Sequence, residues 1–363
     1  MILTLLLGFL QLVQQDLPAP QVIDTQNGLS NNIVYGTYQD REGFIWIATN
    51  NGLNRFDGYS FKTFYHNPKD STSISSNIVR TVLEDPNGRL WVGTFNGLNL
   101  YNPKTASFTR FTDPIDLANI RLDIQQMALD SHGTIWLNTL RTIGAFDTKK
   151  FEFSFIDSLY SASNMALDNQ DRVWLSSQNG TLDEFKPKEN KLINLREANN
   201  KDKQPLYWGK YSKSLWIKDV AFKDAFDTKT SVLPKLPNDT FARNLLEVDE
   251  HTLWIGTEIG LFIYHTITDK LERVKLGNSS TLSSAIRSIY KDNNGGVWVG
   301  TLGGLFHFDS FQKPFEHLDL IPASGDVIMG LETTSGIIYA NALGKGLYSY
   351  DTKSHTIKAK TFA

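Results

Sequence analysis

The feature that most constrains the fold of this chain is a tryptophan that recurs at nearly regular intervals. The recurring tryptophans lie in equivalent contexts, at intervals of 45, 45, 38, 42, 38 and 44 residues, and are Trp46, Trp91, Trp136, Trp174, Trp216, Trp254 and Trp298. The mean interval of 42 residues is the length of one four-stranded blade of a β-propeller. An eighth unit follows with Tyr339 at the tryptophan position, while Trp208 falls outside the pattern. We therefore predict an all-β propeller of four-stranded blades.

The unit around Trp91 shows how each blade is expected to divide into strands. Runs rich in β-branched and aromatic residues, bounded by turn residues, predict strands over 78–84, 90–94, 97–102 and 108–111. An Asp-x-x-Gly turn joins the first two strands, as at Asp85 and Gly88, because Asp bonds turn amides and Gly accepts a positive φ. A Gly-Leu pair opens the third strand, as at Gly97 and Leu98. Because the tryptophan recurs in seven successive units, we expect these side chains to pack between blades rather than to bind a ligand.

The composition excludes several kinds of site. The 363 residues contain no cysteine, so disulfides, thiol nucleophiles, Cys-ligated zinc and iron–sulfur clusters are absent. With 36 basic and 39 acidic residues the net charge is −3, which gives no reason to expect nucleic acid as a partner. No His-x-His or His-Glu-x-x-His spacing, Gly-x-Ser-x-Gly elbow, P-loop or EF-hand loop occurs. We therefore expect no enzyme activity, no cofactor and no metal.

The amino terminus begins with a short apolar run over residues 1–13. The run is too short to span a bilayer, which takes about 20 residues, and it suits the central region of a secretory signal peptide. No Lys or Arg precedes it, and Leu17–Pro20 is not a clean small-x-small cleavage site. We expect a signal peptide over 1–19 and a periplasmic location; the alternative is a buried terminal strand or helix. No later run is long and apolar enough to span a bilayer, so we expect no transmembrane segment in this chain.

The repeat as a whole resembles a known family. The string Asp-x-x-Gly-x-Ile/Leu-Trp-Ile/Val-Gly/Ala-Thr-x-x-Gly-Leu is similar to the two-component regulator propeller repeat, found in the amino-terminal sensor region of hybrid two-component system histidine kinases. Gly28–Asn32, before the first strand of unit 1, and Phe56–Phe61, after its third strand, agree with this resemblance. The likeness covers about residues 20–350 and is clearest in units 1, 2, 6 and 7.

This resemblance implies an extracytoplasmic sensor that recognises an oligosaccharide and signals to a kinase not present in this chain. Complete sensors of the family usually carry two propellers, a small β-sandwich, a membrane helix, a histidine kinase and a DNA-binding regulator. Either this chain is part of such a protein or the sensor half stands alone.

The ring is expected to close through its amino-terminal segment. Residues 20–25 match the fourth strand of other units, and pairing with the three strands of unit 7 would close a ring of seven blades. Closure matters because an open propeller exposes a strand edge. We favour seven blades, with the propeller over 20–313 and the eighth repeat unit over 314–363 as the start of a second propeller. The alternative is one ring of eight blades, in which the eighth unit is the closing blade.

Candidate ligand contacts lie in the turns between the second and third strands. These turns share one face of a propeller with the connections into each first strand, and their residues vary while the scaffold repeats. The candidates for contacts to a polyhydroxylated ligand are Asn50, Asn51, Phe95, Asn96, Arg141, Gln178, Asn179 and Glu258. The alternative for each of them is a solvated turn residue.

Three functions remain open on the sequence, and we favour the first. It is an exported sensor that binds an oligosaccharide or another small ligand. The second is a protein-interaction scaffold, in the form of a homodimer or with another partner. The third is an extracytoplasmic carbohydrate hydrolase or lyase, which would need carboxylates or an arginine cluster converging on the channel.

Overall fold

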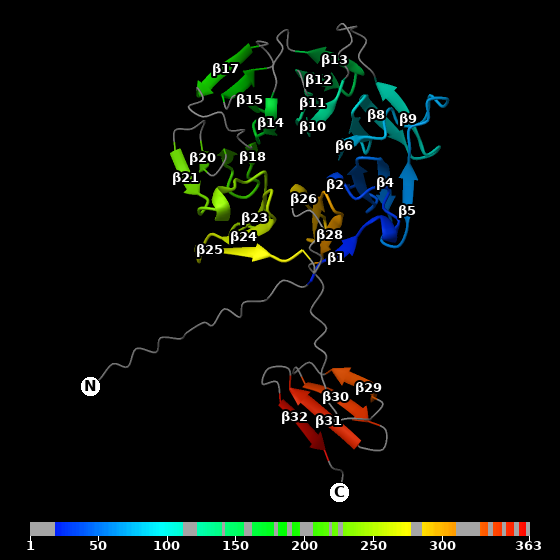
Figure 1. Ribbon diagram of the computed structural model, residues 1–363, viewed down its shortest axis with the longest axis vertical. Coiled ribbons are helices and arrows are strands. Elements are labelled where there is room, and N and C mark those ends of the chain that lie inside the picture. The colour runs from blue at the N-terminus through cyan, green and yellow to red at the C-terminus, as the bar shows by residue number, and fades with distance from the viewer. Residues whose placement is uncertain are drawn as a thin grey trace, which may run out of the picture. The chain divides into compact units, whose positions relative to one another are not determined.

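Short strands separated by tight turns leave each strand to pair with the next one along the chain. In the computed structural model the described residues form four-stranded antiparallel sheets, seven of which make a ring in the unit Met1–Phe311 (Figure 1). A further sheet lies in the second unit, Gln312–Ala363. The structure describes residues 19–111, 122–139, 142–155, 162–177, 181–186, 191–196, 206–217, 220–223, 228–276, 285–309, 327–332, 337–342, 346–351 and 356–360.

The first four blades follow the predicted strand order. Blade 1 contains β2 (Val34–Gln39), β3 (Ile45–Thr49), β4 (Gly52–Phe56) and β5 (Phe61–Phe64). Blade 2 contains β6 (Val79–Glu84), β7 (Leu90–Thr94), β8 (Gly97–Asn102) and β9 (Ser107–Phe111). Blade 3 contains β10 (Ile124–Leu129), β11 (Thr134–Thr139), β12 (Ile143–Asp147) and β13 (Glu152–Phe155). Blade 4 contains β14 (Ala162–Leu167), β15 (Val173–Ser177), β16 (Leu182–Lys186) and β17 (Lys191–Arg196).

Blades 5 to 7 complete the ring, and blade 5 is the least regular of them. Blade 5 contains β18 (Leu206–Trp208), β19 (Leu215–Ile217), β20 (Val220–Lys223) and β21 (Thr228–Val232). Blade 6 contains β22 (Asn244–Glu247), β23 (Thr252–Gly256), β24 (Leu261–His265) and β25 (Lys270–Val274). Blade 7 contains β26 (Ile286–Lys291), β27 (Val297–Thr301), β28 (Leu305–Phe308) and β1 (Gln21–Ile23). Two 3-10 turns, η1 (Thr25–Asn27) and η4 (Pro237–Asp239), lie between strands.

The amino-terminal strand closes the ring, as predicted. β1 pairs antiparallel with β28, so that Gln21 lies opposite His307 and Ile23 lies opposite Leu305. The prediction of seven blades is therefore confirmed. The eighth repeat unit forms a sheet of its own from β29 (Val327–Glu332), β30 (Ile337–Ala342), β31 (Gly346–Asp351) and β32 (Thr356–Lys360).

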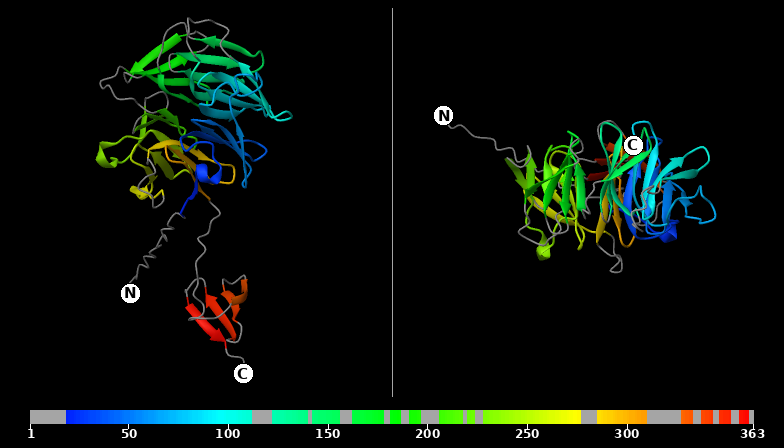
Figure 2. Two further views of the ribbon diagram at one scale, coloured as in Figure 1. Left: turned by 45° about the vertical axis from the view of Figure 1, so that its right-hand side comes forward. Right: turned by 90° about the horizontal axis from the view of Figure 1, so that it is seen from above.

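The first strand of every blade lies innermost. These strands contact one another in a closed sequence, β26, β2, β6, β10, β14, β18, β22 and back to β26. They therefore surround the axis of the ring, and the outermost strands face away from it (Figures 1 and 2).

The Asp-x-x-Gly turn uses both oxygens of its carboxylate. In blade 2, Asp85 Oδ1 accepts the backbone N–H groups of Asn87 and Arg89 at 2.9 and 3.1 Å. Its Oδ2 accepts the indole Nε1–H of Trp91 at 3.0 Å. The bonds to turn amides confirm the sequence interpretation, while the bond to the indole was not predicted. It recurs, at 2.6 to 3.1 Å, in the pairs Asp40–Trp46, Asp130–Trp136, Asp168–Trp174 and Asp292–Trp298.

The tryptophans pack between blades, as expected. The seven repeated indoles are between 0% and 5% exposed. Trp46 of blade 1 lies in one cluster with Val79 and Leu90 of blade 2, and its ring meets Tyr101 edge-on at 4.9 Å between centroids. Each indole therefore joins two blades. Its N–H donates to the Asp of its own turn in blades 1 to 4 and 7, and to Glu247 of blade 6 in blade 5.

A buried threonine shapes the turn between the second and third strands. Thr94 Oγ1 donates to the carbonyl of Gly97 at 3.0 Å and accepts the backbone N–H of Asn96 at 3.0 Å. Gly97 has φ of +103°, a conformation that favours glycine. Thr49, Thr257 and Thr301 make the same bond to the glycine three residues later. The repeated Thr and Gly are therefore scaffold, which leaves the two residues between them free to vary.

The predicted signal peptide over 1–19 lies almost entirely outside the described residues. Among the described residues, no helix is long and apolar enough to cross a membrane.

Candidate ligand-binding site in the central channel

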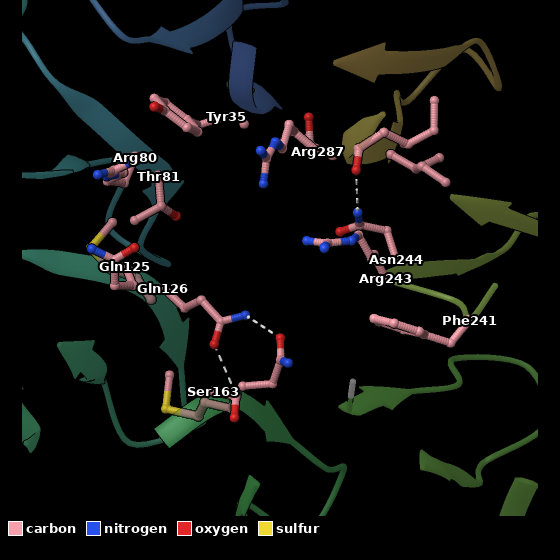
Figure 3. A pocket seen from close by; sticks show the side chains of 17 residues that line it. Tyr35, Arg80, Thr81, Gln125, Gln126, Ser163, Phe241, Arg243, Asn244 and Arg287 are labelled. Atoms are coloured by element: carbon pink, nitrogen blue, oxygen red, sulfur yellow. Dashed lines mark hydrogen bonds between the residues drawn. The ribbon is translucent and has the colours of Figure 1, made fainter. Parts of the chain in front are cut away.

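A polar cavity of about 570 Å³ lies within the ring of innermost strands (Figure 3). Its described lining comes from the beginnings of β2, β6, β10, β14 and β26, together with residues at and just before β22. Because β2 pairs with β3 so that Val34 faces Thr49, these beginnings lie beside the turns that lead into the third strands. The cavity therefore occupies the face of the propeller on which ligand contacts were predicted.

A β-bulge places one side chain from each of five inner strands at this cavity. In blades 1 to 4 and 7 the pairing of the first two strands shifts by one residue near the start of the inner strand. The residues left without a partner in this pairing are Tyr35, Arg80, Gln125, Ser163 and Arg287, and all five line the cavity. Arg243 occupies the same position in blade 6, directly before Asn244, which pairs with Gly256. Bulges re-aim side chains in this way beside many functional sites.

The cationic part of the lining consists of three arginines (Figure 3). The Arg80 guanidinium lies 4.3 Å from the centroid of the Tyr35 ring, and its Nε is 3.9 Å from Asp123 Oδ1. Arg243 forms an ion pair with Glu258 through Nη2. The pKa of the Arg243 guanidinium lies below its ordinary value, first because the group is partly buried and then because the positive charge of Arg287 lies nearby.

The amide part of the lining is held by its own hydrogen bonds. Gln126 Nε2 donates to Asn164 Oδ1 at 3.2 Å, and Gln126 Oε1 accepts from the Met165 backbone N–H at 2.8 Å and from Asn138 Nδ2 at 2.9 Å. Asn244 Nδ2 donates to the carbonyl of Ile286 at 3.3 Å. These bonds join blades 3 and 4 and blades 6 and 7, so the amides are fixed in position before any ligand arrives. Preorganisation of this kind lowers the entropy lost on binding.

Some lining groups retain unused hydrogen-bonding capacity. The hydroxyl of Ser163 and the Nε atoms of Arg80 and Arg243 are buried and have no hydrogen-bond partner among the described residues. Buried polar atoms are normally paired, and unpaired ones at a cavity are candidates for ligand contacts. The described lining therefore offers donors from several blades to a polar ligand.

The described lining of the cavity does not offer the carboxylate pair of a glycoside hydrolase. This described lining contains no Asp, Glu or His, whereas glycoside hydrolysis uses a pair of carboxylates. No group of three or more metal-ligating side chains was found in the described part of the chain.

The predicted contact residues that the structure describes lie on the same face as the cavity, but none of them belongs to its described lining. Asn50 Oδ1 accepts a hydrogen bond from the Tyr35 hydroxyl at 3.0 Å, and Glu258 pairs with Arg243, so both support lining residues. Asn51 and Asn96 are exposed and Phe95 is half-buried, in turns held by Thr49 and Thr94. Arg141, Gln178 and Asn179 lie outside the described residues. A role in binding stays a prediction for all eight.

The residues at the bulges were missed by sequence reasoning. An alternating strand pattern assigns them to the scaffold, because a bulge changes the alternation by one residue. A signal was nevertheless present. Each of these positions follows an apolar residue at the start of the strand, and its own identity changes from blade to blade, as in Val34-Tyr35, Val79-Arg80 and Ile286-Arg287.

The fold and site define the chain as a seven-bladed β-propeller with a polar central channel. Three of its segments, residues 28–51, 73–96 and 281–303, match the two component regulator propeller family. The resemblance seen in the sequence is thereby confirmed for these three segments. A curated relative, Histidine kinase P4 of Formosa agariphila, is 50% identical over 48 residues, which are 13% of this chain and 4% of that protein.

Solved structures with the same fold include extracellular domains of a two component and a one component system. The extracellular domain of the hybrid two component system BT3049 from B. thetaiotaomicron aligns over 94% of this chain with a TM-score of 0.66 and 22% identity. The extracellular domain of the one component system BT4673 from the same organism aligns over 96%, with a TM-score of 0.66 and 18% identity. This chain spans 49% and 48% of those two domains.

The same fold also occurs in an enzyme. Virginiamycin B lyase from Staphylococcus aureus aligns over 79% of this chain and 97% of its own, with a TM-score of 0.61 and 12% identity. At such identities the likeness shows the fold alone, so the function must be argued from the site.

Proposed function

We propose that this chain is the exported, periplasmic sensor propeller of a two-component regulatory system, and that its central channel binds an oligosaccharide. The observation that carries the proposal is the cavity of about 570 Å³ whose polar side chains come from six blades. A volume of this size lies within the range of small-ligand sites. The matched repeats and the extracellular sensor domains of the same fold support the regulatory context.

Convergence on one cavity also suggests how binding would be transmitted. A ligand that contacts Tyr35, Gln126 and Arg287 touches blades 1, 3 and 7 at once. Such a ligand can change the relative stability of two arrangements of the blades only if it binds them with different affinity. In the proposed function, a kinase outside this chain responds to that shift.

Binding of a panel of oligosaccharides, measured by calorimetry and by the shift in melting temperature, tests the proposal. We expect at least one glycan to bind the wild-type chain and to lose affinity in Tyr35→Ala, because Tyr35 lines the cavity. Tyr59→Ala is the matched control. Tyr59 is 97% exposed and lies in the turn between β4 and β5, on the opposite face. A folded protein that binds no glycan, or binds one equally well with Tyr35→Ala, would contradict the proposal.

A further inference from the structure

We infer that the channel selects ligands carrying an anionic group, a carboxylate or a sulfate ester, and that Arg243 and Arg287 bind this group. The inference rests on the proposed function, because it specifies the ligand of the same cavity. Three observations carry it: the charges of the lining, the adjacency of the two arginines, and the donors that they keep unpaired.

The described lining of the cavity carries positive charge and no negative charge. Its charged members are Arg80, Arg243 and Arg287, although the whole chain has a net charge of −3. The accumulation of positive charge is therefore local to this cavity. Walls of low dielectric strengthen the field inside a cleft, so the cavity attracts anions and repels cations.

Arg243 and Arg287 come from adjacent blades. Arg243 directly precedes β22, Arg287 is the second residue of β26, and these two strands are in contact. The lowered pKa of Arg243 has the charge of Arg287 among its causes, after burial. The two groups therefore repel each other, and an anion placed against both would remove this repulsion.

Neither arginine has all of its donors occupied by the described residues. Arg287 forms no salt bridge or side-chain hydrogen bond with the described residues, and the buried Nε of Arg243 has no hydrogen-bond partner there. The Glu258 side chain that pairs with Arg243 is 56% exposed, so water weakens that ion pair. The planar fork of a guanidinium matches the paired oxygens of a carboxylate or sulfate.

The rest of the cavity suits the uncharged part of a sugar chain. Across the cavity from the arginine pair, Gln126 and the Ser163 hydroxyl offer amide and hydroxyl groups, and Tyr35 supplies an aromatic ring (Figure 3). Sugars present hydroxyl groups and apolar faces that these side chains can contact. An acidic oligosaccharide would use both parts of the lining, whereas a neutral one would leave Arg287 without an ionic partner among the described residues.

The test compares acidic and neutral oligosaccharides of matched length on the full chain. The probes are trigalacturonate and a sulfated carrageenan tetrasaccharide, with neutral galactotriose and the desulfated tetrasaccharide as their counterparts. We expect at least one acidic probe to bind at least about tenfold more tightly than its neutral counterpart, and Arg287→Met to remove most of that preference. The two acidic probes distinguish a carboxylate from a sulfate as the recognised group.

Arg41→Met is the control for the loss of one positive charge. Arg41 lies in the Asp-x-x-Gly turn of blade 1, on the opposite face, and pairs with Glu84 of blade 2. The Arg41→Met variant should bind the acidic probes with unchanged affinity. Thermal unfolding of each variant checks that the propeller is intact.

The outcomes separate this inference from the proposed function. If neutral probes bind as tightly as acidic ones, or if Arg287→Met keeps the preference, the inference is wrong while the channel remains a glycan site. If no probe binds to the folded wild-type chain, the inference fails, and the proposed function fails with it when the wider glycan panel yields no ligand either.

Discussion

Blades 2 and 5 provide the hydrogen-bond acceptor for their buried indole N–H in different ways. In blade 2 the partner of Trp91 is Asp85 of its own turn, which also bonds two turn amides. In blade 5 the partner of Trp216 is Glu247, on β22 of the neighbouring blade, at 3.2 Å from Nε1. Glu247 also accepts the backbone N–H groups of Tyr211 and Ser212 at 2.7 and 3.0 Å. One carboxylate therefore takes over the role of the other from across the blade interface.

The difference shows which part of the repeat is physically required. A buried indole N–H and two turn amides need an acceptor, and leaving such groups unpaired is costly. The position of that acceptor in the sequence is less restricted, because a longer side chain on the next blade reaches the same place. Blade 5 therefore departs from the repeat in sequence while it keeps the same hydrogen-bonding pattern.

The largest expected effect comes from removing the indoles themselves. Trp91 and Trp216 are 0% and 2% exposed, so Trp91→Ala and Trp216→Ala should each lower the free energy of unfolding by about 3–5 kcal/mol. Chemical denaturation, with a check that the slope against denaturant is unchanged, measures this loss. A loss near zero for Trp216→Ala would mean that blade 5 does not depend on its indole as blade 2 does.

A smaller effect is expected from the two carboxylates. Asp85→Ala and Glu247→Ala should each cost about 1–3 kcal/mol for every buried donor left unpaired. Hydrogen exchange distinguishes the two variants. Asp85→Ala should expose the amides of Asn87 and Arg89 in blade 2, whereas Glu247→Ala should expose those of Tyr211 and Ser212 in blade 5.

Glu247→Gln is the control for this comparison, because its amide oxygen can still accept the indole hydrogen bond. It should recover part of the stability lost in Glu247→Ala. If Gln and Ala are equally destabilising, the charge of Glu247 matters and its place as a hydrogen-bond acceptor does not.

The smallest effect concerns pH and the third strand of blade 7. His307 stacks on Trp298 at 3.8 Å between centroids, where blade 2 has Leu100 opposite Trp91. Burial lowers the pKa of His307, and the charge of Asp292 only partly opposes this. The unfolded chain then binds the proton more readily, so stability should fall as the pH drops below the ordinary histidine value of about 6.5.

His307→Leu, which copies blade 2, should flatten this dependence. The measurement is the melting temperature of both proteins between neutral and mildly acidic pH. An equal slope for the two proteins would show that His307 is not its source.

The regular part of the fold could be predicted from the sequence because its signals are local. Turn residues bound each strand of blade 2, and β7 and β8 begin and end at the predicted residues. The Asp–Trp hydrogen bond lies within six residues, yet a sequence does not show which oxygen faces which donor. Glu247 was beyond prediction for a different reason, since its partner lies on another blade.

The candidate site depended on information that the sequence carries only weakly. The predicted turns were placed on the face where the cavity lies, because strand order and turn positions determine that face. The side chains that line the cavity come from bulges, whose positions follow from pairing between strands rather than from one strand's own pattern. The three arginines of the lining, Arg80, Arg243 and Arg287, are distant in the chain. They come to line one cavity only when the ring is complete.

Ring closure by β1 has a consequence for the order of folding. β1 is synthesised first among the described strands, and its partner β28 is the last strand of the ring to be made. During synthesis β1 therefore has no pairing partner until β28 is made, while blades 1 to 6 can form from neighbouring segments. Contacts between distant segments form slowly, and intermediates with unpaired strand edges tend to aggregate. A nascent chain that stops before β28 would keep both the edge of blade 7 and β1 unpaired, so the closing strand makes completion of the ring a checkpoint for the whole propeller.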